Sequence, residues 1–390
     1  MVSSRLSSIN KSASLALTRV AADFKQKGIK VYNFGIGEPD FTTPEGIINA
    51  SYDGARRGMT HYTPSSGLPQ LRQAIAEKLT VFNGIPGALA EEVVVTPTKF
   101  ALYASLLALL EPGDGVLIPE PYYLSYPDIV RLAGGKALPF PLPCDYAFDL
   151  EAAEDLVTPR TKVMIFNSPV NPTGKVYSEK DIRKLSDFVI EHDLMLISDE
   201  IYEYIIFKGK HFSPASIPEM RERTVTVSGF SKSHAMTGWR IGYLHAPEEI
   251  ANACDLIQQQ TITCAPSISQ VAAIEALKDS ESPRKFTAEF KERRDIVVKM
   301  LNEIDGINVI EPEGTFYAFP HFDLHFGSER FSSDLLKERH VAVTPGRAFG
   351  ERFDDHFRLS FAAKEEDLVK GIEELGNFMK TRKAEQTAGS

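Results

Sequence analysis

Short apolar runs recur along the first two thirds of the chain and alternate with helical patterns. The runs lie at residues 93–95, 116–118, 163–166, 194–197, 224–227 and 241–244. One intervening helix is well marked, because Ser178 and Asp181 have the spacing of a capping box and an apolar stripe follows over residues 182–189. Near-continuous apolar strands separated by helices are typical of a mostly parallel sheet that is covered on both faces. The pattern therefore predicts an α/β fold.

The pattern changes beyond residue 280, where a charged helix is predicted over residues 285–304. Four strand candidates follow, at residues 307–310, 315–319, 341–343 and 357–361. A chain of 390 residues exceeds the size at which a single hydrophobic core usually divides. We therefore expect a large domain over residues 45–280 and a smaller α+β domain that combines residues 1–44 with residues 281–390.

The two ends of the chain differ in pattern. Apolar residues recur at helical spacing over residues 17–24 and end at Gly28, which predicts an N-terminal amphipathic helix before an extended segment at residues 30–34. The polar residues 381–390 predict a frayed tail. The sequence contains no run of about eighteen apolar residues, and residues 1–11 lack the apolar region of a signal peptide. We therefore predict a cytoplasmic protein that does not enter a membrane.

Charge and cysteine content narrow the classes of ligand. Acidic residues outnumber basic residues by 53 to 43, which gives a formal net charge of −10. Proteins that bind nucleic-acid backbones need a basic face, so a small-molecule ligand is predicted instead. The cysteines Cys144, Cys254 and Cys264 are scattered and form neither a disulfide framework nor a Cys-x-x-Cys metal site. This cysteine usage is consistent with a reducing cytosol.

Three loops that follow predicted strands carry polar residues, at residues 167–171, 199–202 and 228–232. Ligands of open α/β sheets bind at the carboxyl ends of the strands, so we expect these loops to converge. Lys232 ends the third loop and is flanked by serines. A lysine at this place suits an amine nucleophile that holds an aldehyde as a Schiff base, and pyridoxal phosphate is the obvious aldehyde. Taken alone, a Ser-Lys pair is more often a solvated surface feature.

The other two loops offer partners for such a cofactor. Asp199 follows a strand, and a carboxylate that faces the pyridine nitrogen keeps it protonated, so that the ring can accept electrons. Asn171 and Tyr202 can donate hydrogen bonds to the phenolic oxygen of the cofactor, which favours the ionised form of that oxygen. Both polar loops also have simpler interpretations. Asp199 can be a helix N-cap, and Asn171 can be part of an Asn-Pro turn.

Further residues are candidates for holding the phosphate and the ring. Arg240, eight positions after Lys232, offers a forked cation for the phosphate, and Ser228 and Ser231 offer hydroxyl groups. The ring of Tyr123 can stack on the pyridine face. A tyrosine buried in the core would look the same in the sequence, so this interpretation depends on where the loops lie.

Six motifs occur in a fixed order along the chain. They are Gly-Glu-Pro-Asp-Phe at 37–41 with Thr-Pro at 43–44, His-Tyr-Thr-Pro at 61–64 with Gly67, Asn-Pro-Thr-Gly at 171–174, Ser-Asp-Glu-Ile-Tyr at 198–202, the lysine block at 228–243 and Phe-Arg-Leu-Ser at 357–360. Together they resemble the motifs of class I aminotransferases, which are fold-type I pyridoxal phosphate enzymes, close to the bacterial and archaeal aspartate aminotransferases. The resemblance covers almost the whole chain.

The resemblance implies a role for each residue around the cofactor ring. Lys232 would form the internal aldimine and, once released by the substrate amine, would act as the general base. Asp199 would pair with the pyridine nitrogen. Asn171 and Tyr202 would hold the phenolic oxygen, and Tyr123 would stack on the ring. The implied reaction moves an amino group from an amino acid to a 2-oxo acid.

The resemblance also implies how the substrate and the cofactor phosphate are bound. Arg358, helped by Gly37 and Asn171, would grip the substrate α-carboxylate, because an arginine fork matches a carboxylate. The residues expected around the phosphate are Arg240, Ser231, Thr98, Lys99 and, reaching across from a second subunit, Tyr62. A homodimer with shared active sites is therefore implied.

The chain departs from the family pattern at two places. The segment around Thr98 and Lys99 is one residue shorter than the usual phosphate cup and is not rich in glycine. Gly229 stands where many relatives have a phosphate-binding serine, so that Ser228 or Ser231 would compensate.

Lys99 also bears on the choice of substrate. The resemblance implies that a lysine at this place contacts the distal carboxylate in dicarboxylate-specific members, so aspartate or glutamate with 2-oxoglutarate is predicted. Tyr123 is expected beside the same substrate, and residues 12–15 are expected to line the entrance of the substrate site. The alternative for Lys99 is a solvent-facing lysine at the start of a helix.

Other functions remain as alternatives. An aminotransferase for aromatic or neutral amino acids, a β-lyase or a cyclopropane-forming synthase would use the same lysine, aspartate and arginine, and the product, a keto acid or ammonia and a thiol, separates these reactions. A non-catalytic regulator of this fold would usually carry a fused DNA-binding module, which the acidic charge disfavours. His321 and His325 raise the possibility of a zinc hydrolase, but the glutamate of a His-Glu-x-x-His motif is missing and no metal is predicted.

Overall fold

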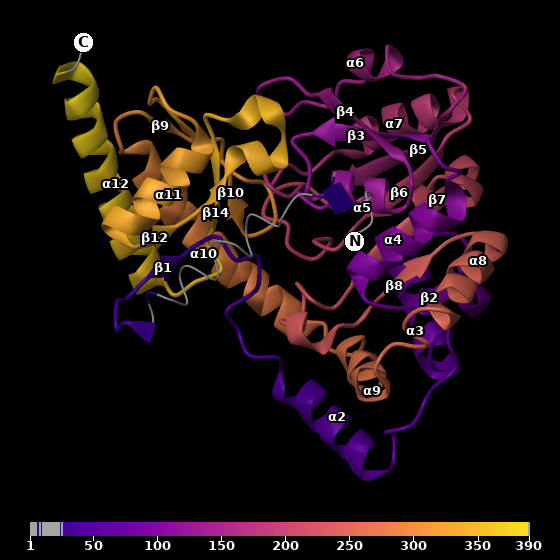
Figure 1. Cartoon of the computed structure of the whole chain (residues 1–390). Helices are drawn as coiled ribbons and strands as arrows, with labels where there is room; N and C mark the ends of the chain where they lie inside the picture. Colours follow the sequence, from indigo (N-terminus) through magenta and orange to yellow (C-terminus); the bar gives the residue numbers. More distant parts are fainter. Residues whose placement is uncertain (1–5, 8, 10–23, 25, 389–390) are drawn as a thin grey trace.

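A seven-stranded sheet forms the centre of the computed structural model, which describes residues 6, 7, 9, 24 and 26–388 (Figure 1). In spatial order its strands are β2 (Val93–Val95), β8 (Gly242–His245), β7 (Thr224–Gly229), β6 (Met195–Asp199), β5 (Thr161–Asn167), β3 (Gly115–Glu120) and β4 (Lys136–Pro141). The strands from β7 to β4 are parallel, whereas β8 is antiparallel to both of its neighbours. The predicted α/β class with a mostly parallel sheet is confirmed.

Helices cover both faces of this sheet, as Figure 1 shows. They are α2 (Glu45–Arg56), α3 (Pro69–Val81), α4 (Thr98–Leu109), α5 (Tyr126–Leu132), α6 (Glu151–Glu154), α7 (Glu179–Glu191), α8 (Glu248–Gln259) and α9 (Ser267–Ala276). Helix α4 packs against β7, β8 and α8, and α2 packs against α9. Among the helices that the structure describes, none combines the length and the apolar character needed to cross a bilayer.

Helix α7 begins at the predicted capping box. The side chain of Ser178 accepts a hydrogen bond from the Asp181 amide at 3.3 Å, and the Asp181 carboxylate accepts one from the Ser178 amide at 3.0 Å. The apolar stripe that follows is buried, with Ile182 and Leu185 at 1% and 0% exposure. Local capping and the apolar period therefore agree with each other, and this predicted helix is confirmed.

Strand β4 was not predicted, because its sequence Lys-Ala-Leu-Pro-Phe-Pro contains two prolines. Proline lacks the backbone N–H that a central strand needs, so it is confined to edge strands and bulges. β4 is the edge strand of the sheet and pairs only with β3 among the described strands. Pro139 and Pro141 are therefore tolerated there.

A second group of elements lies beside the sheet and contains the remaining strands. It comprises β1 (Tyr32–Asn33), α10 (Glu281–Asn302), β9 (Ile307–Asn308), β10 (Tyr317–Ala318), β11 (His321–Phe322), α11 (Ser328–Arg339), β12 (Val341–Ala342), β13 (Thr344–Pro345), β14 (Phe357–Ser360) and α12 (Glu365–Ala388). β14 pairs with β10 and β13, and β1 pairs with β12. A phenylalanine-rich cluster fills this group and also includes Tyr202 and Ile205 from the segment after β6. The domain division at residues 45 and 280 stays a prediction.

The C-terminal region corrects one expectation. The predicted frayed tail is wrong up to Ala388, because α12 continues to that residue. Polar ion pairs support this part of the helix, since Arg382 contacts Asp334 and Glu338 of α11, and Lys383 contacts Asp305 at 2.8 Å. The predicted helix over residues 17–21 and the predicted entrance residues 12–15 lie outside the described residues.

Candidate active site

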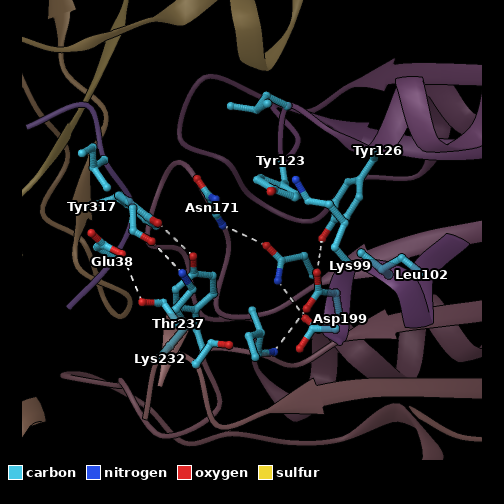
Figure 2. Close-up of a pocket in the computed structure, with 18 of the residues that line it drawn as sticks. Glu38, Lys99, Leu102, Tyr123, Tyr126, Asn171, Asp199, Lys232, Thr237 and Tyr317 are labelled. Carbon is cyan, nitrogen blue, oxygen red and sulfur yellow. Dashed lines mark hydrogen bonds between the residues drawn. The ribbon is translucent and has the colours of Figure 1, made fainter. Parts of the chain in front are cut away.

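A cavity of about 300 Å³ lies at the carboxyl ends of β5, β6 and β7, between the sheet and the second group of elements (Figure 2). It is lined by eleven of the predicted site residues. They are Gly37, Thr98, Lys99, Tyr123, Asn171, Asp199, Tyr202, Ser231, Lys232, Arg240 and Arg358. The three polar loops thus converge on one cavity, as expected for the carboxyl edge of a parallel sheet.

Asp199 ends β6 and is buried in the wall of this cavity. Its carboxylate accepts a hydrogen bond from the hydroxyl of Tyr126 at 2.7 Å and one from the amide of Ile201 at 3.2 Å. Burial raises the pKa of Asp199 to about 6, although the hydrogen bond from Tyr126 opposes the rise. None of the described cations forms a salt bridge with Asp199. A buried carboxylate in this state favours a cationic ligand.

Lys232 lies just after β7 and faces the same cavity (Figure 2). Its Nζ atom donates a hydrogen bond to the Gly37 carbonyl at 2.6 Å. Burial, and next the positive charge of Arg358, lower the pKa of Lys232 to about 8. A substantial fraction of the amine is therefore neutral, and nucleophilic, slightly above neutral pH.

Arg358 is a buried cation that β14 places at the cavity, with 2% of its surface exposed. Its guanidinium donates to neutral acceptors, namely Asn171 Oδ1 at 3.1 Å and the Gly35 carbonyl at 2.9 Å. Its Nε atom has no hydrogen-bond partner in the described structure. A buried guanidinium without a carboxylate partner is well suited to an anionic ligand.

The loop after β5 is held by Asn167. The Asn167 amide group donates to the Asp199 carbonyl at 2.8 Å, and its Oδ1 atom accepts from the Asn171 backbone amide at 2.9 Å. Because Asn171 Oδ1 accepts from Arg358, the Nδ2 group of Asn171 remains as its donor toward a ligand. These hydrogen bonds fix Asn171 relative to the Asp199 backbone and to the guanidinium of Arg358.

The N-terminus of α4 forms another wall of the cavity. The amides of Phe100 and Ala101 donate to the Pro97 carbonyl at 2.8 and 2.9 Å, whereas Thr98 and Lys99 begin the helix and have no preceding turn to bond with. Free amides and the helix dipole make such an N-terminus a binding site for a phosphate. Arg240 and Ser231 line the same cavity and can add a cation and a hydroxyl group.

Thr98 also explains why Gly229 replaces the usual serine. A Cβ atom at Gly229 would lie 2.9 Å from Thr98 Oγ1 and 2.7 Å from the Gly242 Cα atom. The threonine side chain therefore fills the space that a serine at position 229 would need. Ser228 does not compensate, because its hydroxyl donates to Glu203 at 2.6 Å and does not line the cavity.

Glu200 and Glu203 lie on the other side of the segment that carries Asp199. We call Lys78, Asn83, Glu200, Glu203 and His211 the rear network. Glu200 accepts from Asn83 at 2.9 Å and contacts His211 at 2.8 Å, and Glu203 accepts from Lys78 at 2.6 Å and from Asn83 at 2.8 Å. Glu200, Glu203 and His211 are close enough together to resemble a metal site. The donors of Lys78 and Asn83 already engage these carboxylates, so the contacts favour an ionic network.

Tyr62, like Ser228, is a predicted residue that does not line the cavity. Its side chain is 86% exposed. Lys99 does line the cavity, where its Nζ atom lies 5.5 Å from the centre of the Tyr123 ring and donates to Ser125 Oγ at 3.3 Å. Lys99 and Tyr123 appear together on one side of the site in Figure 2.

Sequence reasoning assigned no role to several residues that line the cavity, among them Tyr126, Tyr317, Glu38 and Thr237. The Thr237 hydroxyl donates to Glu38 at 3.1 Å, at the outer edge of the site. Glu38 and Thr237 stand within motifs that were already noted, yet nothing in the residue pattern shows which side chains of those motifs turn inward. The histidine pair behind the zinc alternative lies elsewhere, and His321 contacts Asp355 at 3.4 Å.

Comparison with known proteins gives consistent results. The family model of class I and II aminotransferases matches residues 29–375. A probable aspartate/prephenate aminotransferase of Aquifex aeolicus (strain VF5) is 42% identical over 386 residues, which cover 96% of this chain and 97% of that protein. The aromatic-amino-acid aminotransferase 2 of Thermococcus litoralis is 39% identical and the match covers 98% and 99% of the two chains. A solved structure of Thermus thermophilus aspartate aminotransferase with maleate has a TM-score of 0.92 at 37% identity, covering 97% of this chain and 99% of that one.

The fold and these matches define an enzyme that uses pyridoxal phosphate to transfer amino groups. The chain belongs to the class I and II aminotransferase family. The resemblance inferred from the six sequence motifs is confirmed, and with it the cofactor and the class of reaction.

Proposed function

We propose that the enzyme transfers the amino group of aspartate or glutamate to a 2-oxo acid such as 2-oxoglutarate. The observation that carries this proposal is that two cations of different exposure, Arg358 and Lys99, line one cavity. Arg358 is buried and can bind the α-carboxylate, which every amino acid has. Lys99 is exposed at the start of α4 and can bind a second, distal carboxylate. The Thermus aspartate aminotransferase structure, whose ligand maleate is a dicarboxylate, supports this choice.

The residues that line the cavity fit pyridoxal phosphate at three points. Lys232 supplies the amine for the aldehyde, the unneutralised Asp199 matches a protonated pyridine nitrogen, and the N-terminus of α4 matches the phosphate. When bound, the cofactor withdraws electrons from the substrate α-carbon. Tyr123 would cover one face of the ring. Asn171 and Tyr202 would donate hydrogen bonds to its phenolic oxygen.

Lys232 would move the proton in this reaction. Once the substrate amine has displaced it, its Nζ atom can accept the proton of the substrate α-carbon. A general base works best when its pKa is close to the working pH, and a pKa of about 8 satisfies this condition. Arg358 contributes twice, because it holds the substrate carboxylate and its charge lowers the pKa of Lys232.

We also propose a cytoplasmic homodimer with shared active sites. Tyr62 is 86% exposed and Tyr52 is 59% exposed, so large aromatic side chains are available for a second copy. In such a dimer Tyr62 would complete the phosphate site of the partner. A mixture of Tyr62→Phe and Lys232→Ala chains tests this arrangement, because a hybrid dimer contains one site with neither change. Activity of the mixture above that of either variant alone is expected, and no gain would contradict the shared site.

Substrate choice is tested with a panel of amino acids and 2-oxoglutarate. Loss of a charged hydrogen bond costs about 1.5–3 kcal/mol, so Lys99→Ala is expected to lower kcat/KM for aspartate and glutamate about tenfold to a hundredfold. Alanine and phenylalanine should be affected much less. Lys180→Ala, an exposed change on α7, is the matched control. Equal losses for all four amino acids would contradict the proposal.

Aromatic substrates are the second candidate, because the Thermococcus relative is an aromatic-amino-acid aminotransferase. In the cavity Lys99 lies above the Tyr123 ring, and Leu102 and Ile36 add apolar surface, so a substrate ring also has a wall to pack against. The same panel distinguishes this candidate by a higher kcat/KM for phenylalanine than for aspartate. Ammonia or a thiol in place of a keto acid would instead indicate a β-lyase.

A further inference from the structure

Tyr317 touches three parts of the active site at once. It lies in β10 with 1% of its surface exposed. Its hydroxyl is 2.9 Å from the hydroxyl of Tyr202, and its ring centre is 4.3 Å from the guanidinium carbon of Arg358. A Cβ atom at Gly37 would lie 2.1 Å from the Tyr317 hydroxyl, so the Gly37 loop closes directly over it. Tyr317, Gly37 and Lys232 all line the cavity, and Figure 2 shows Tyr317 near Lys232.

The bond between the two tyrosines has two possible directions, and they have different consequences. Each phenol has a single proton to donate. If Tyr202 donates to Tyr317, its proton is used and it cannot donate to the cofactor. If Tyr317 donates to Tyr202, the proton of Tyr202 remains available for a ligand oxygen in the cavity. The proposed role of Tyr202 therefore requires Tyr317 to be the donor.

The charge of Arg358 favours this direction. Burial raises the pKa of both phenols, and it raises that of Tyr202 well above its usual range. The guanidinium of Arg358 opposes the rise for both phenols, and it lies against the ring of Tyr317, 4.3 Å from the ring centre. The more acidic phenol is the better hydrogen-bond donor. Tyr123, from the segment after β3, is a further titratable group that acts on both phenols.

We propose that Tyr317 is a positioning residue that acts through two neighbours: its hydroxyl donates to Tyr202, and its ring supports the guanidinium of Arg358. The first contact leaves the proton of Tyr202 free for the phenolic oxygen of the cofactor. The second contact holds the fork that binds the substrate carboxylate. This inference rests on the proposed roles of Tyr202 and Arg358, and it gives Tyr317 a role that acts through these two residues.

The hydroxyl contact is tested by a pH titration of the visible absorption of the holoenzyme. Tyr317→Phe removes the donor to Tyr202, so that Tyr202 becomes a weaker donor to the ionised phenolic oxygen and the bound cofactor keeps its proton to higher pH. Tyr202→Phe loses the whole hydrogen bond to that oxygen, which corresponds to a shift of about half a pH unit, so Tyr317→Phe should raise the midpoint by a fraction of that amount. Tyr177→Phe is the matched control, because it removes a buried hydroxyl whose partner is the Tyr146 carbonyl and which does not line the cavity. It should leave the midpoint unchanged.

A double-mutant cycle separates this inference from the role of Tyr202. Tyr202→Phe alone should raise the midpoint, and Tyr317→Phe should add nothing in that background, because both changes break one chain of donors. If Tyr202→Phe has no effect, the role of Tyr202 is wrong. If Tyr202→Phe shifts the midpoint and Tyr317→Phe does not, the role of Tyr202 stands. The proposed donation from Tyr317 to Tyr202 is then wrong.

The ring contact is tested by the affinity for succinate, an unreactive dicarboxylate, in the holoenzyme. Tyr317→Phe keeps the ring under Arg358 and should change the Kd less than about twofold. Tyr317→Leu removes the ring, and a cation–π contact of this kind corresponds to a loss on the order of tenfold. Equal affinities for the Phe and Leu variants would overturn the support of Arg358. Far-ultraviolet circular dichroism of both variants shows that the fold is retained.

Discussion

The segment over residues 199–203 has two sides, and the charges on them are treated differently. On the cavity side, Asp199 forms no salt bridge within the described part of the chain, and burial raises its pKa to about 6. On the rear side, Glu203 is equally buried, yet its pKa is lowered, because the charges of Lys78 and His211 outweigh burial. The same piece of chain thus carries one carboxylate that still needs a cation and one that already has it.

This contrast separates a binding site from a scaffold. Lys232 and Arg358, like Asp199, face the cavity without an oppositely charged partner among the residues that the structure describes, so their charges are available to a ligand. In the rear network Lys78 contacts Glu203 at 2.6 Å and Asn83 at 2.8 Å, and both carboxylates receive several donors. Buried charge alone therefore does not identify an active site. Buried charge that lacks a protein partner does.

The largest expected effect is at Lys232. Lys232→Ala removes the amine that carries the cofactor and moves the proton, and a general base alone contributes about 10²–10⁴ in rate. We expect turnover to fall at least about a thousandfold and the visible absorption band of bound cofactor to be lost. In the wild type, borohydride should bleach this band and fix the mass of the cofactor on Lys232. An unchanged band with wild-type turnover in the variant would remove the residue from the mechanism.

The next largest effect is expected on stability, from a change in the rear network. Lys78→Met leaves Glu203 buried without its cation, which typically costs about 3–5 kcal/mol of stability. We expect this loss in urea unfolding of the cofactor-free protein. The double variant Lys78→Met with Glu203→Gln removes both charges and should regain most of the loss. If the double variant is as unstable as the single one, the ion pair is not the cause.

On the cavity side, removal of a buried charge should instead stabilise the protein. The pKa of Asp199 is about 6 in the folded protein, whereas the ordinary value, expected in the unfolded chain, is 3.8. At pH 7 folding therefore disfavours the ionised form of this carboxyl group. Asp199→Asn should therefore stabilise the cofactor-free protein by up to about 3 kcal/mol at pH 7. The gain should shrink as the pH falls from 6 toward 4, where the wild-type carboxyl group becomes protonated. Urea unfolding at both pH values measures this, and weaker cofactor binding should accompany it.

The smallest effect concerns the protonation of Lys232 itself. In the cofactor-free protein, the rate of reductive methylation of Lys232 should rise through a midpoint near pH 8, not near 10.5. Burial is the first cause of this lowered pKa and Arg358 is the second, so Arg358→Leu should move the midpoint upward without restoring the full value. Peptide mass spectrometry at several pH values measures the rate. A midpoint near 10.5 in the wild type would place Lys232 with ordinary solvated lysines.

The sequence was most informative where chemistry coincides with the end of a strand. Lys232, Asp199 and Asn171 follow strands whose apolar pattern is clear, so the topology alone brings them to one edge of the sheet. Tyr126 and Tyr317 were missed for the opposite reason. Each stands among other aromatic residues, and only the packed structure shows which ring faces Asp199 or Arg358. Pairing between distant side chains is not encoded in a local pattern.

The fold shows the same limit. Strands β5, β6 and β7 are continuous apolar runs in the middle of the sheet and were predicted from that pattern. The short strands β11 and β13 were not predicted, because they lie outside the apolar runs that indicated the equally short strands β9, β10 and β12. The C-terminal turns of α12 were also missed, since the polar residues Arg382 and Lys383 suggest a frayed tail until their ion pairs with other elements are known.

The contact between Thr98 and Gly229 makes the two positions epistatic. A serine at position 229 collides with Thr98 Oγ1 and with the Gly242 backbone, whereas a smaller residue at position 98 would relieve one of the two collisions. A serine taken from a relative therefore needs both a smaller residue at position 98 and a shift of the Gly242 backbone away from position 229. Chimeras that exchange one of these segments without the other would carry the incompatibility at the site where the phosphate is expected.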